Sequence, residues 1–270
     1  MDVAKHDLAR QAVQEGRFSD AEETYRQIVA DDPGDTDGHF YLAALQLRRG
    51  EDVAAIRSIE CAIDCDPDNA RNHVAHGQIL REQKKTEEAE TAFEKALAIE
   101  PDNGDAYTNL GVMLFELGRY DDAAFTLRKA LIYHPNHTPA ATQLGRALLR
   151  LHRVEEAVSL FHAVLQLDPH DANVQVNIGI GCTLLGDLAS AQEAFEASLL
   201  NEPDNVEAHV NYAHLLLLQG DFEAGYREHE WRLKKTGYRA LADFKSVMWS
   251  DEDLAGKTVL LLGEQGLGDT

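Results

Sequence analysis

Proline recurs every 34 residues along this chain, and that period constrains the fold more than any other feature of the sequence. Six of the seven prolines fall on it, at Pro33, Pro67, Pro101, Pro135, Pro169 and Pro203. Alanine keeps the same period from Ala21 to Ala191, and a small residue, alanine or glycine, keeps it from Ala9 to Ala213. A fixed period of this length is typical of stacked supersecondary units, each of which buries its apolar face against its neighbours.

The fourth unit, residues 104–137, shows what each unit is expected to form. Its two halves are each apolar at helical spacing, so the pattern predicts two amphipathic helices. Gly118 lies between the halves, where glycine can adopt the positive φ that often follows a helix C-terminus. Gly111 and Ala123 are the small members of the two helices, and they indicate that the helices approach each other closely.

A short polar residue follows most of the periodic prolines by two positions and is expected to cap the next helix. These residues are Asp35, Asn69, Asn103, Asp171 and Asn205. Such side chains accept hydrogen bonds from the free N–H groups of a first helical turn. At the fourth joint His137 stands in this place, so we expect Thr138 to cap and Pro139 to occupy the first helical position.

The 34-residue period, the small pair, the large residue of the second helix and the closing proline together resemble the tetratricopeptide repeat (TPR). The resemblance implies an all-α fold, a right-handed superhelical solenoid of about seven helix-turn-helix repeats whose first helices line the concave wall. The frame covers residues 2–239. Its expected repeats are residues 2–35, 36–69, 70–103, 104–137, 138–171, 172–205 and 206–239.

The charge of the chain argues against two classes of partner. Its 25 basic and 47 acidic residues give a net charge of −22. This field repels nucleic acid and anionic membrane surfaces, so we expect neither as a partner. The sequence shows no signal-peptide pattern and no apolar run of membrane-spanning length. Its three cysteines, an odd number, are interpreted as reduced thiols, and the expected location is the cytoplasm.

Arginines and amides gather at the positions that the resemblance assigns to the concave face. They are Arg10, Arg48, Arg71, Gln78, Arg81, Asn109, Arg146, Arg150, Asn177, Asn211 and His214. On an acidic chain, such arginines favour an acidic peptide or a C-terminal carboxylate. The alternative is that they are solvated side chains paired with neighbours such as Glu82 and Glu116.

One position of the repeat carries a row of amides. Asn109, Asn177 and Asn211 occupy it in three of the last four repeats. Gln143 interrupts these asparagines, and Asp7, Tyr41 and Ala75 occupy the position in the first three repeats. Because an amide both donates and accepts, such a row can hold an extended peptide backbone. Protein O-GlcNAc transferases, which the chain resembles here, carry an asparagine ladder of this kind. The expected peptide site is therefore Asn109, Gln143, Arg146, Arg150, Asn177, Asn211 and His214; the alternative assigns the asparagines to bonds between helices.

Twelve histidines raise the alternative of a metal site. No HExxH motif and no Cys/His ligand set occurs. His39, His73 and His209 share one repeat position, where a packed ring is expected. We therefore expect no metal and no cofactor.

The period ends after Arg239. Residues 240–257 are expected to form a capping helix and linker, and residues 258–270 contain the strand pattern TVLLL followed by the glycine-rich loop GEQGLGDT. Gly263, Gly266 and Gly268 make that loop a candidate phosphate or acceptor site. The segment resembles the start of a GT-B glycosyltransferase-like domain in bacterial TPR proteins.

A single strand cannot form a parallel sheet, so residues 258–270 predict only a short C-terminal β stub. We expect no catalytic residue and no enzymatic activity in the chain itself. The expected function is that of a protein- or peptide-binding TPR module that recruits substrates for a glycosyltransferase. The alternative is a free-standing TPR scaffold for assembly of protein complexes.

Overall fold

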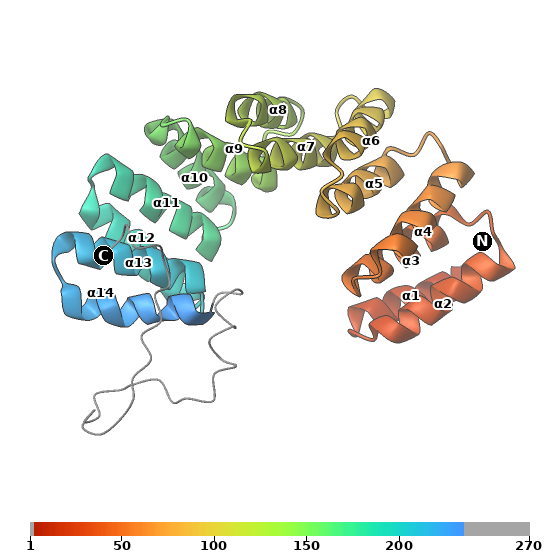
Figure 1. Ribbon diagram of the computed structural model, residues 1–270, viewed down its shortest axis with the longest axis horizontal. Helices are drawn as coiled ribbons and strands as arrows, with labels where there is room; N and C mark the ends of the chain where they lie inside the picture. Colours follow the sequence, from red (N-terminus) through yellow and green to blue (C-terminus); the bar gives the residue numbers. More distant parts are fainter. Residues whose placement is uncertain (1–2, 235–270) are drawn as a thin grey trace, which may run out of the picture.

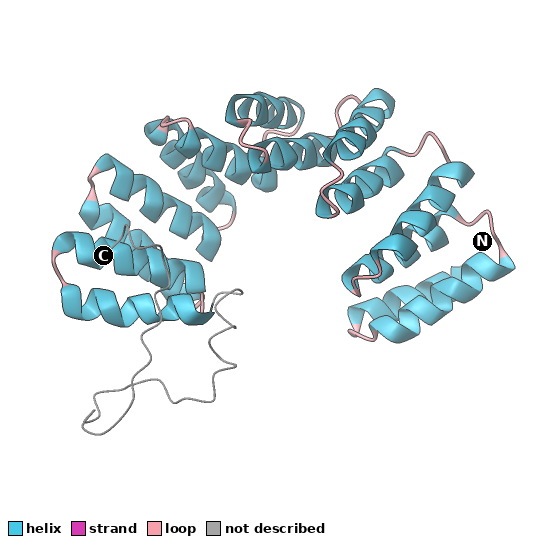
Figure 2. Ribbon diagram, in the orientation of Figure 1, coloured by secondary structure: helices cyan, strands magenta, loops and turns pink. Residues whose placement is uncertain are grey.

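The computed structural model describes residues 3–234, and all regular structure in that range is helical (Figure 2). The helices form pairs. The first helix of each pair is α1 (Val3–Gln14), α3 (Thr36–Arg48), α5 (Ala70–Glu82), α7 (Gly104–Glu116), α9 (Thr138–Arg150), α11 (Ala172–Leu185) or α13 (Val206–Gln219). The second is α2 (Phe18–Asp31), α4 (Asp52–Cys65), α6 (Thr86–Ile99), α8 (Tyr120–Tyr133), α10 (Val154–Leu167), α12 (Leu188–Asn201) or α14 (Phe222–His229). A short 3-10 helix, η1 (Glu230–Lys234), follows α14.

The pairs stack side by side into an arch (Figure 1). Each helix packs against its pair partner, and each second helix packs against the first helix of the next pair. From α3 to α13 every odd-numbered helix also contacts the odd-numbered helix of the next pair. Within residues 3–234 the even-numbered helices make no comparable contact with one another. The odd-numbered helices therefore lie on the concave side of the arch, and helices such as α6 and α8 lie on its outer side (Figure 1).

The small residue of each first helix is where the two helices of a pair come closest. Gly111 and Ala123 are both buried, as the sequence predicts, but the side chain that faces Gly111 is Leu127. A Cβ atom added at Gly111 would lie 2.5 Å from Leu127 Cγ. The same arrangement recurs with a phenylalanine ring at Gly77–Phe93, Gly145–Phe161 and Gly179–Phe195. In these four pairs an added Cβ atom would fit only if the facing large side chain moved.

The turn inside each pair requires a left-handed residue. In five pairs this residue is a glycine, with φ between 74° and 87°: Gly16, Gly50, Gly118, Gly186 and Gly220. Lys84 and His152 take the same place in the third and fifth pairs, with φ of 60° and 57°. The geometry of the repeat is thus kept where the glycine is missing, at a cost of about 1–2 kcal/mol for an L-residue in this conformation.

Most of the predicted helix caps are confirmed. The side chains of Asp35, Asn103, Asp171 and Asn205 each accept a hydrogen bond from a backbone N–H three residues on, at 2.7 to 3.0 Å. Asn69 stands at the N-cap of α5 but accepts no capping hydrogen bond, and its amide donates to Asp66 at 3.2 Å.

The expected cap at the fourth joint is wrong. The N-cap of α9 is His137, whose Nδ1 accepts from the N–H of Ala140 at 3.2 Å, and Pro139 stands at the second helical position. The Nδ1 atom of a neutral imidazole carries a lone pair and stands about as far from the backbone as a carboxylate oxygen of aspartate does. A histidine can therefore cap a helix in the same way.

Several sequence predictions concern residues that lie outside the described range. They are the last residues of the seventh repeat (235–239), the capping helix and linker (240–257), and the strand and glycine-rich loop (258–270), including Gly263, Gly266 and Gly268.

Candidate peptide-binding surface

The row of amides lies on four successive helices of the concave side. Asn109 is on α7, Gln143 on α9, Asn177 on α11 and Asn211 on α13, and all four side chains are half-buried. The helical register sets this arrangement, because residues 34 apart stand at the same turn of equivalent helices. The structure therefore places these amides at equivalent positions of successive helices.

The hydrogen bonds of these amides differ along the row. Asn109 Nδ2 donates to the carbonyl of Asp105 at 2.9 Å, and its Oδ1 accepts from Gln78 at 3.0 Å. Asn211 Nδ2 donates to the carbonyl of Glu207 at 2.8 Å, and its Oδ1 receives no bond within residues 3–234. Asn177 makes no hydrogen bond in the same range. The alternative role, bonding between helices, thus applies to Asn109 alone, while Asn177 and Asn211 keep acceptors for a ligand.

Two arginines of α9 are held by aromatic rings of the preceding pair. The guanidinium carbon of Arg146 lies 5.2 Å from the ring centre of Phe115, and that of Arg150 lies 4.9 Å from the ring centre of Tyr120. Arg146 also donates to Gln143 Oε1 at 3.1 Å. Neither arginine forms an ion pair with a described residue. A guanidinium that stacks by its face keeps N–H groups at its edge for a carboxylate.

Other arginines of the first helices already have partners. Arg81 lies 3.8 Å from Glu116, as the alternative interpretation expects, but Glu82 pairs with none of the described arginines. Arg71 lies 3.4 Å from Asp37 and stacks over Phe40. Arg10 lies 3.5 Å from Asp7. Arg48 differs from these three, because it stacks over Phe18 and has no described carboxylate partner.

The C-terminal end of the concave side also carries two exposed leucines, which the sequence-based prediction of the site did not include. Leu184 and Leu218 are 59% and 64% exposed, and they occupy the place of Arg150 in the next two repeats. The 34-residue period could have predicted this exposure, because it assigns both leucines to the repeat position of Arg150. His214, the last residue of the expected peptide site, is also exposed, and its ring centre lies 5.6 Å from that of His229.

The histidines with a shared repeat position have a structural role. Nε2 of His39, His73 and His209 bonds the carbonyl oxygen of the proline six residues before it, at 3.1, 2.8 and 2.8 Å. Gln175 makes the same bond to Pro169 at 3.3 Å. These side chains tie the start of a first helix to the joint before it. Within residues 3–234 no group of three or more His, Cys, Asp or Glu side chains is placed to hold a metal ion.

The comparison with protein families agrees with this architecture. Two models, both described as tetratricopeptide repeat, match the chain, one over residues 80–141 and 114–177 and the other over residues 6–70 and 185–226. The chain is a tetratricopeptide repeat protein. Proteins of this family are generally scaffolds that bind other proteins and not enzymes. Among curated proteins, no sequence matches the chain.

Solved TPR structures share the fold. A TPR protein from Parabacteroides merdae has a TM-score of 0.69 and 16% identity over 89% of this chain and 95% of its own. The pilF protein of Pseudomonas aeruginosa has a TM-score of 0.64 and 21% identity over 74% of this chain and 90% of its own. YrrB, a TPR protein with an unusual peptide-binding site, has a TM-score of 0.52 and 26% identity over 69% of this chain and 96% of its own. No helix within residues 3–234 is both long and apolar enough to cross a membrane.

Proposed function

We propose that this TPR protein binds an extended peptide along the concave side of α7, α9, α11 and α13. The observation that carries the proposal is that Oδ1 of Asn177 and Oδ1 of Asn211, at equivalent turns of adjacent helices, receive no hydrogen bond from any described residue. Their Oδ1 atoms accept N–H groups of a peptide backbone, which binds the peptide with little dependence on its sequence. YrrB, which is 26% identical, supports the proposal as a TPR protein with a peptide-binding site.

The side chains beside the amides add a preference for sequence. Arg146 and Arg150 present guanidinium groups without carboxylate partners among the described residues, so an acidic side chain of the peptide is favoured at α9. Leu184 and Leu218 favour an apolar side chain toward α13. A peptide with an acidic segment followed or preceded by an apolar segment fits this surface best.

Peptide titration tests this function. A binding peptide is first selected from a displayed random library, and its Kd is then measured by calorimetry. Each lost hydrogen bond costs about 0.5–1.5 kcal/mol, so replacing Asn177 and Asn211 together by alanine should weaken binding roughly fivefold or more. The matched control replaces Gln27 and Gln166, exposed amides of α2 and α10, by alanine and should leave the Kd unchanged. If the Asn177/Asn211 double variant binds the peptide as tightly as the wild type, with an unchanged circular dichroism spectrum, these two amides do not hold the peptide.

We further propose that the frame of seven 34-residue repeats extends over residues 2–239 and that the module recruits substrates for a glycosyltransferase domain. The resemblance of residues 258–270 to the start of such a domain supports this role, with residues 240–257 as the linker. In that domain Gly263, Gly266 and Gly268 belong to an acceptor-side loop. A coding sequence that continues after Thr270 with alternating strand and helix patterns is expected, whereas a stop codon there favours a free-standing scaffold.

The proposed compartment is the cytoplasm. Cys61 and Cys65 are exposed, Cys182 is buried, and all three are free thiols. Free exposed thiols are typical of a reducing compartment. Fractionation of cells that express the protein at its natural level measures the location directly.

A further inference from the structure

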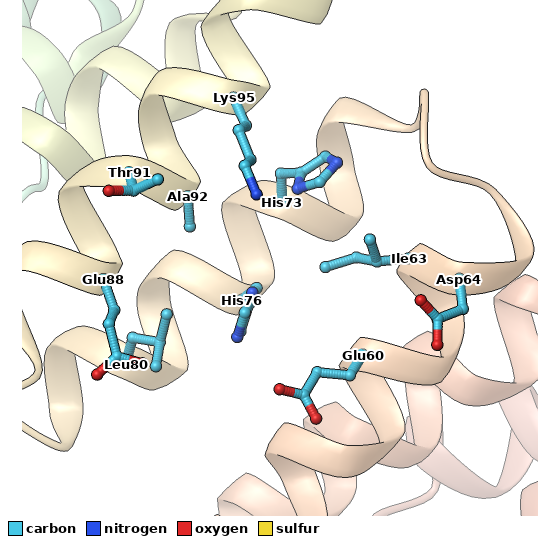
Figure 3. Close-up of a pocket in the computed structure, with 10 residues that line it drawn as sticks. All are labelled: Glu60, Ile63, Asp64, His73, His76, Leu80, Glu88, Thr91, Ala92 and Lys95. Atoms are coloured by element: carbon cyan, nitrogen blue, oxygen red, sulfur yellow. The ribbon is translucent and has the colours of Figure 1, made fainter.

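A cavity of about 320 Å³ lies between α4, α5 and α6 (Figure 3), and its lining includes α6, a helix of the outer side of the arch. Glu60 and Asp64 of α4 line one wall, and Glu88 of α6 lies on the opposite wall. His76 of α5 lies between them, and Ile63 and Leu80 supply apolar surface. The volume is at the lower end of the range for ligand pockets, about 300–1,000 Å³, and suits a single side chain.

The charged groups of this cavity lack partners. Glu60, Asp64 and Glu88 make no ion pair and no hydrogen bond with any residue of the described range. Lys95, the cationic lysine of the lining, is also unpaired there, and it extends toward His73 (Figure 3). Three carboxylates against one ammonium leave the cavity negative, so it is complementary to a cation.

The contacts between other consecutive helix pairs, called joints here, show which cation this chain places beside such carboxylates. At three joints an ion pair connects the two helix pairs and involves the second helix of the earlier pair. An arginine supplies the positive charge each time. The pairs are Arg49–Glu22 at 2.7 Å, Arg119–Glu90 at 3.5 Å and Arg128–Glu156 at 3.5 Å. Among the described residues, no ion pair joins α4 to the third pair, although α4 presents Glu60 and Asp64 there. The joint has the carboxylates but not the guanidinium.

His76 departs from the repeat pattern at the same place. The equivalent residues in the other repeats are all apolar or aromatic: Leu8, Leu42, Leu110, Leu144, Ile178 and Tyr212. His76 is half-buried and forms no hydrogen bond within residues 3–234. Burial lowers the pKa of His76. The nearby His73 and Lys95 lower this pKa further, whereas the carboxylates of Glu60 and Glu88 raise it. The ring is therefore neutral at pH 7 and offers a nitrogen acceptor to the cavity.

We propose that this cavity receives the side chain of an arginine presented by a partner protein. The guanidinium lies among Glu60, Asp64 and Glu88 and donates to His76, and its methylene groups cover Ile63 and Leu80. A planar guanidinium with five N–H donors matches several separated acceptors, whereas an ammonium group is a compact point charge. Its lining residues lie on α4, α5 and α6, so the site is separate from the peptide surface on α7, α9, α11 and α13.

The test uses a capped amino acid as the probe. N-acetyl-L-arginine amide is titrated into the full chain and followed by NMR, and N-acetyl-L-citrulline amide serves as the uncharged isostere. We expect saturable shifts with the arginine probe and at least tenfold weaker binding of citrulline. Glu60→Gln should weaken the arginine probe fivefold or more. Glu94→Gln, the same charge change at the equivalent position of α6, should change it less than twofold.

A second variant separates binding from stability. His76→Leu restores the residue type of the other repeats, so we expect its Tm to rise by roughly 2–4 °C while the arginine probe binds at least fivefold more weakly. Equal affinity for arginine and citrulline, or equal effects of Glu60→Gln and Glu94→Gln, would overturn the site. Binding of free agmatine tenfold tighter than the capped arginine would show that the cavity serves a small metabolite and would overturn the partner assignment.

Discussion

Gly145→Ala is the substitution that tests the packing of the helix pairs most sharply. The added Cβ would lie 2.3 Å from Cε1 and 2.5 Å from Cζ of Phe161, a ring that is fully buried. Such overpacking costs about 1–3 kcal/mol. Alanine in place of a mid-helix glycine gains about 1 kcal/mol in helix propensity. The two terms oppose each other, and with an overpacking cost in the middle of its range, about 2 kcal/mol, the net expectation is a loss of about 1 kcal/mol.

Urea denaturation, followed by circular dichroism, measures this loss as a lower midpoint. The matched control is taken from the chain itself, because the second pair holds alanine and isoleucine at these positions, Ala43 and Ile59, and both are buried. Phe161→Ile alone should cost roughly 1–3 kcal/mol through the volume that it removes. The double variant Gly145→Ala/Phe161→Ile should be less destabilised than the sum of its two parts, by about 1 kcal/mol or more.

Two results would refute this reasoning. One is a Gly145→Ala protein that is as stable as the wild type, since it would mean that the pair separates without cost. The other is strict additivity in the double variant, since contact between residues 145 and 161 is what couples them.

Three further predictions rest on single contacts. Lys84→Gly and His152→Gly should each raise the free energy of unfolding by about 0.5–1 kcal/mol in urea titrations, because glycine adopts the positive φ without strain. Asp35→Asn should destabilise the protein at pH 7 but less at pH 3. Burial raises the pKa of the Asp35 carboxyl, but hydrogen bonds from His6 and Gly38 outweigh burial, so the net pKa is lowered. The stability that the carboxylate contributes is therefore lost as the pH falls. As the pH falls from 7.5 to 5, the wild type should lose stability relative to His76→Leu. The pKa of His76 is lower in the folded protein than in the unfolded chain, so protonation favours the unfolded chain.

The sequence predicted the helix pairs, their turns and most of their caps, because each depends on residues close together in the chain. The period then extended one local pattern along the array, and it placed Asn109, Gln143, Asn177 and Asn211 on successive helices. Local rules were wrong at two caps: His137 takes the capping role at the start of α9, and Asn69 makes no capping hydrogen bond at the start of α5.

What the sequence left open depends on contacts between repeats. Residue pairing across a joint, such as Arg128 with Glu156, follows from side-chain rotamers that no period specifies. The stacking of Arg150 on Tyr120 has the same origin. The cavity between α4, α5 and α6 lies where α4 makes no ion pair with the next helix pair in the described range, and a missing partner is visible only when three helices are placed together.

Amide hydrogen exchange with a bound peptide tests the central claim most directly, because it locates the ligand on the arch. A selected peptide is added at saturation, and exchange is measured helix by helix with and without it. The account predicts added protection in α7, α9, α11 and α13 and unchanged exchange in α8, α10 and α12. Protection confined to the even-numbered helices would contradict it, because the peptide would then bind the outer side of the arch.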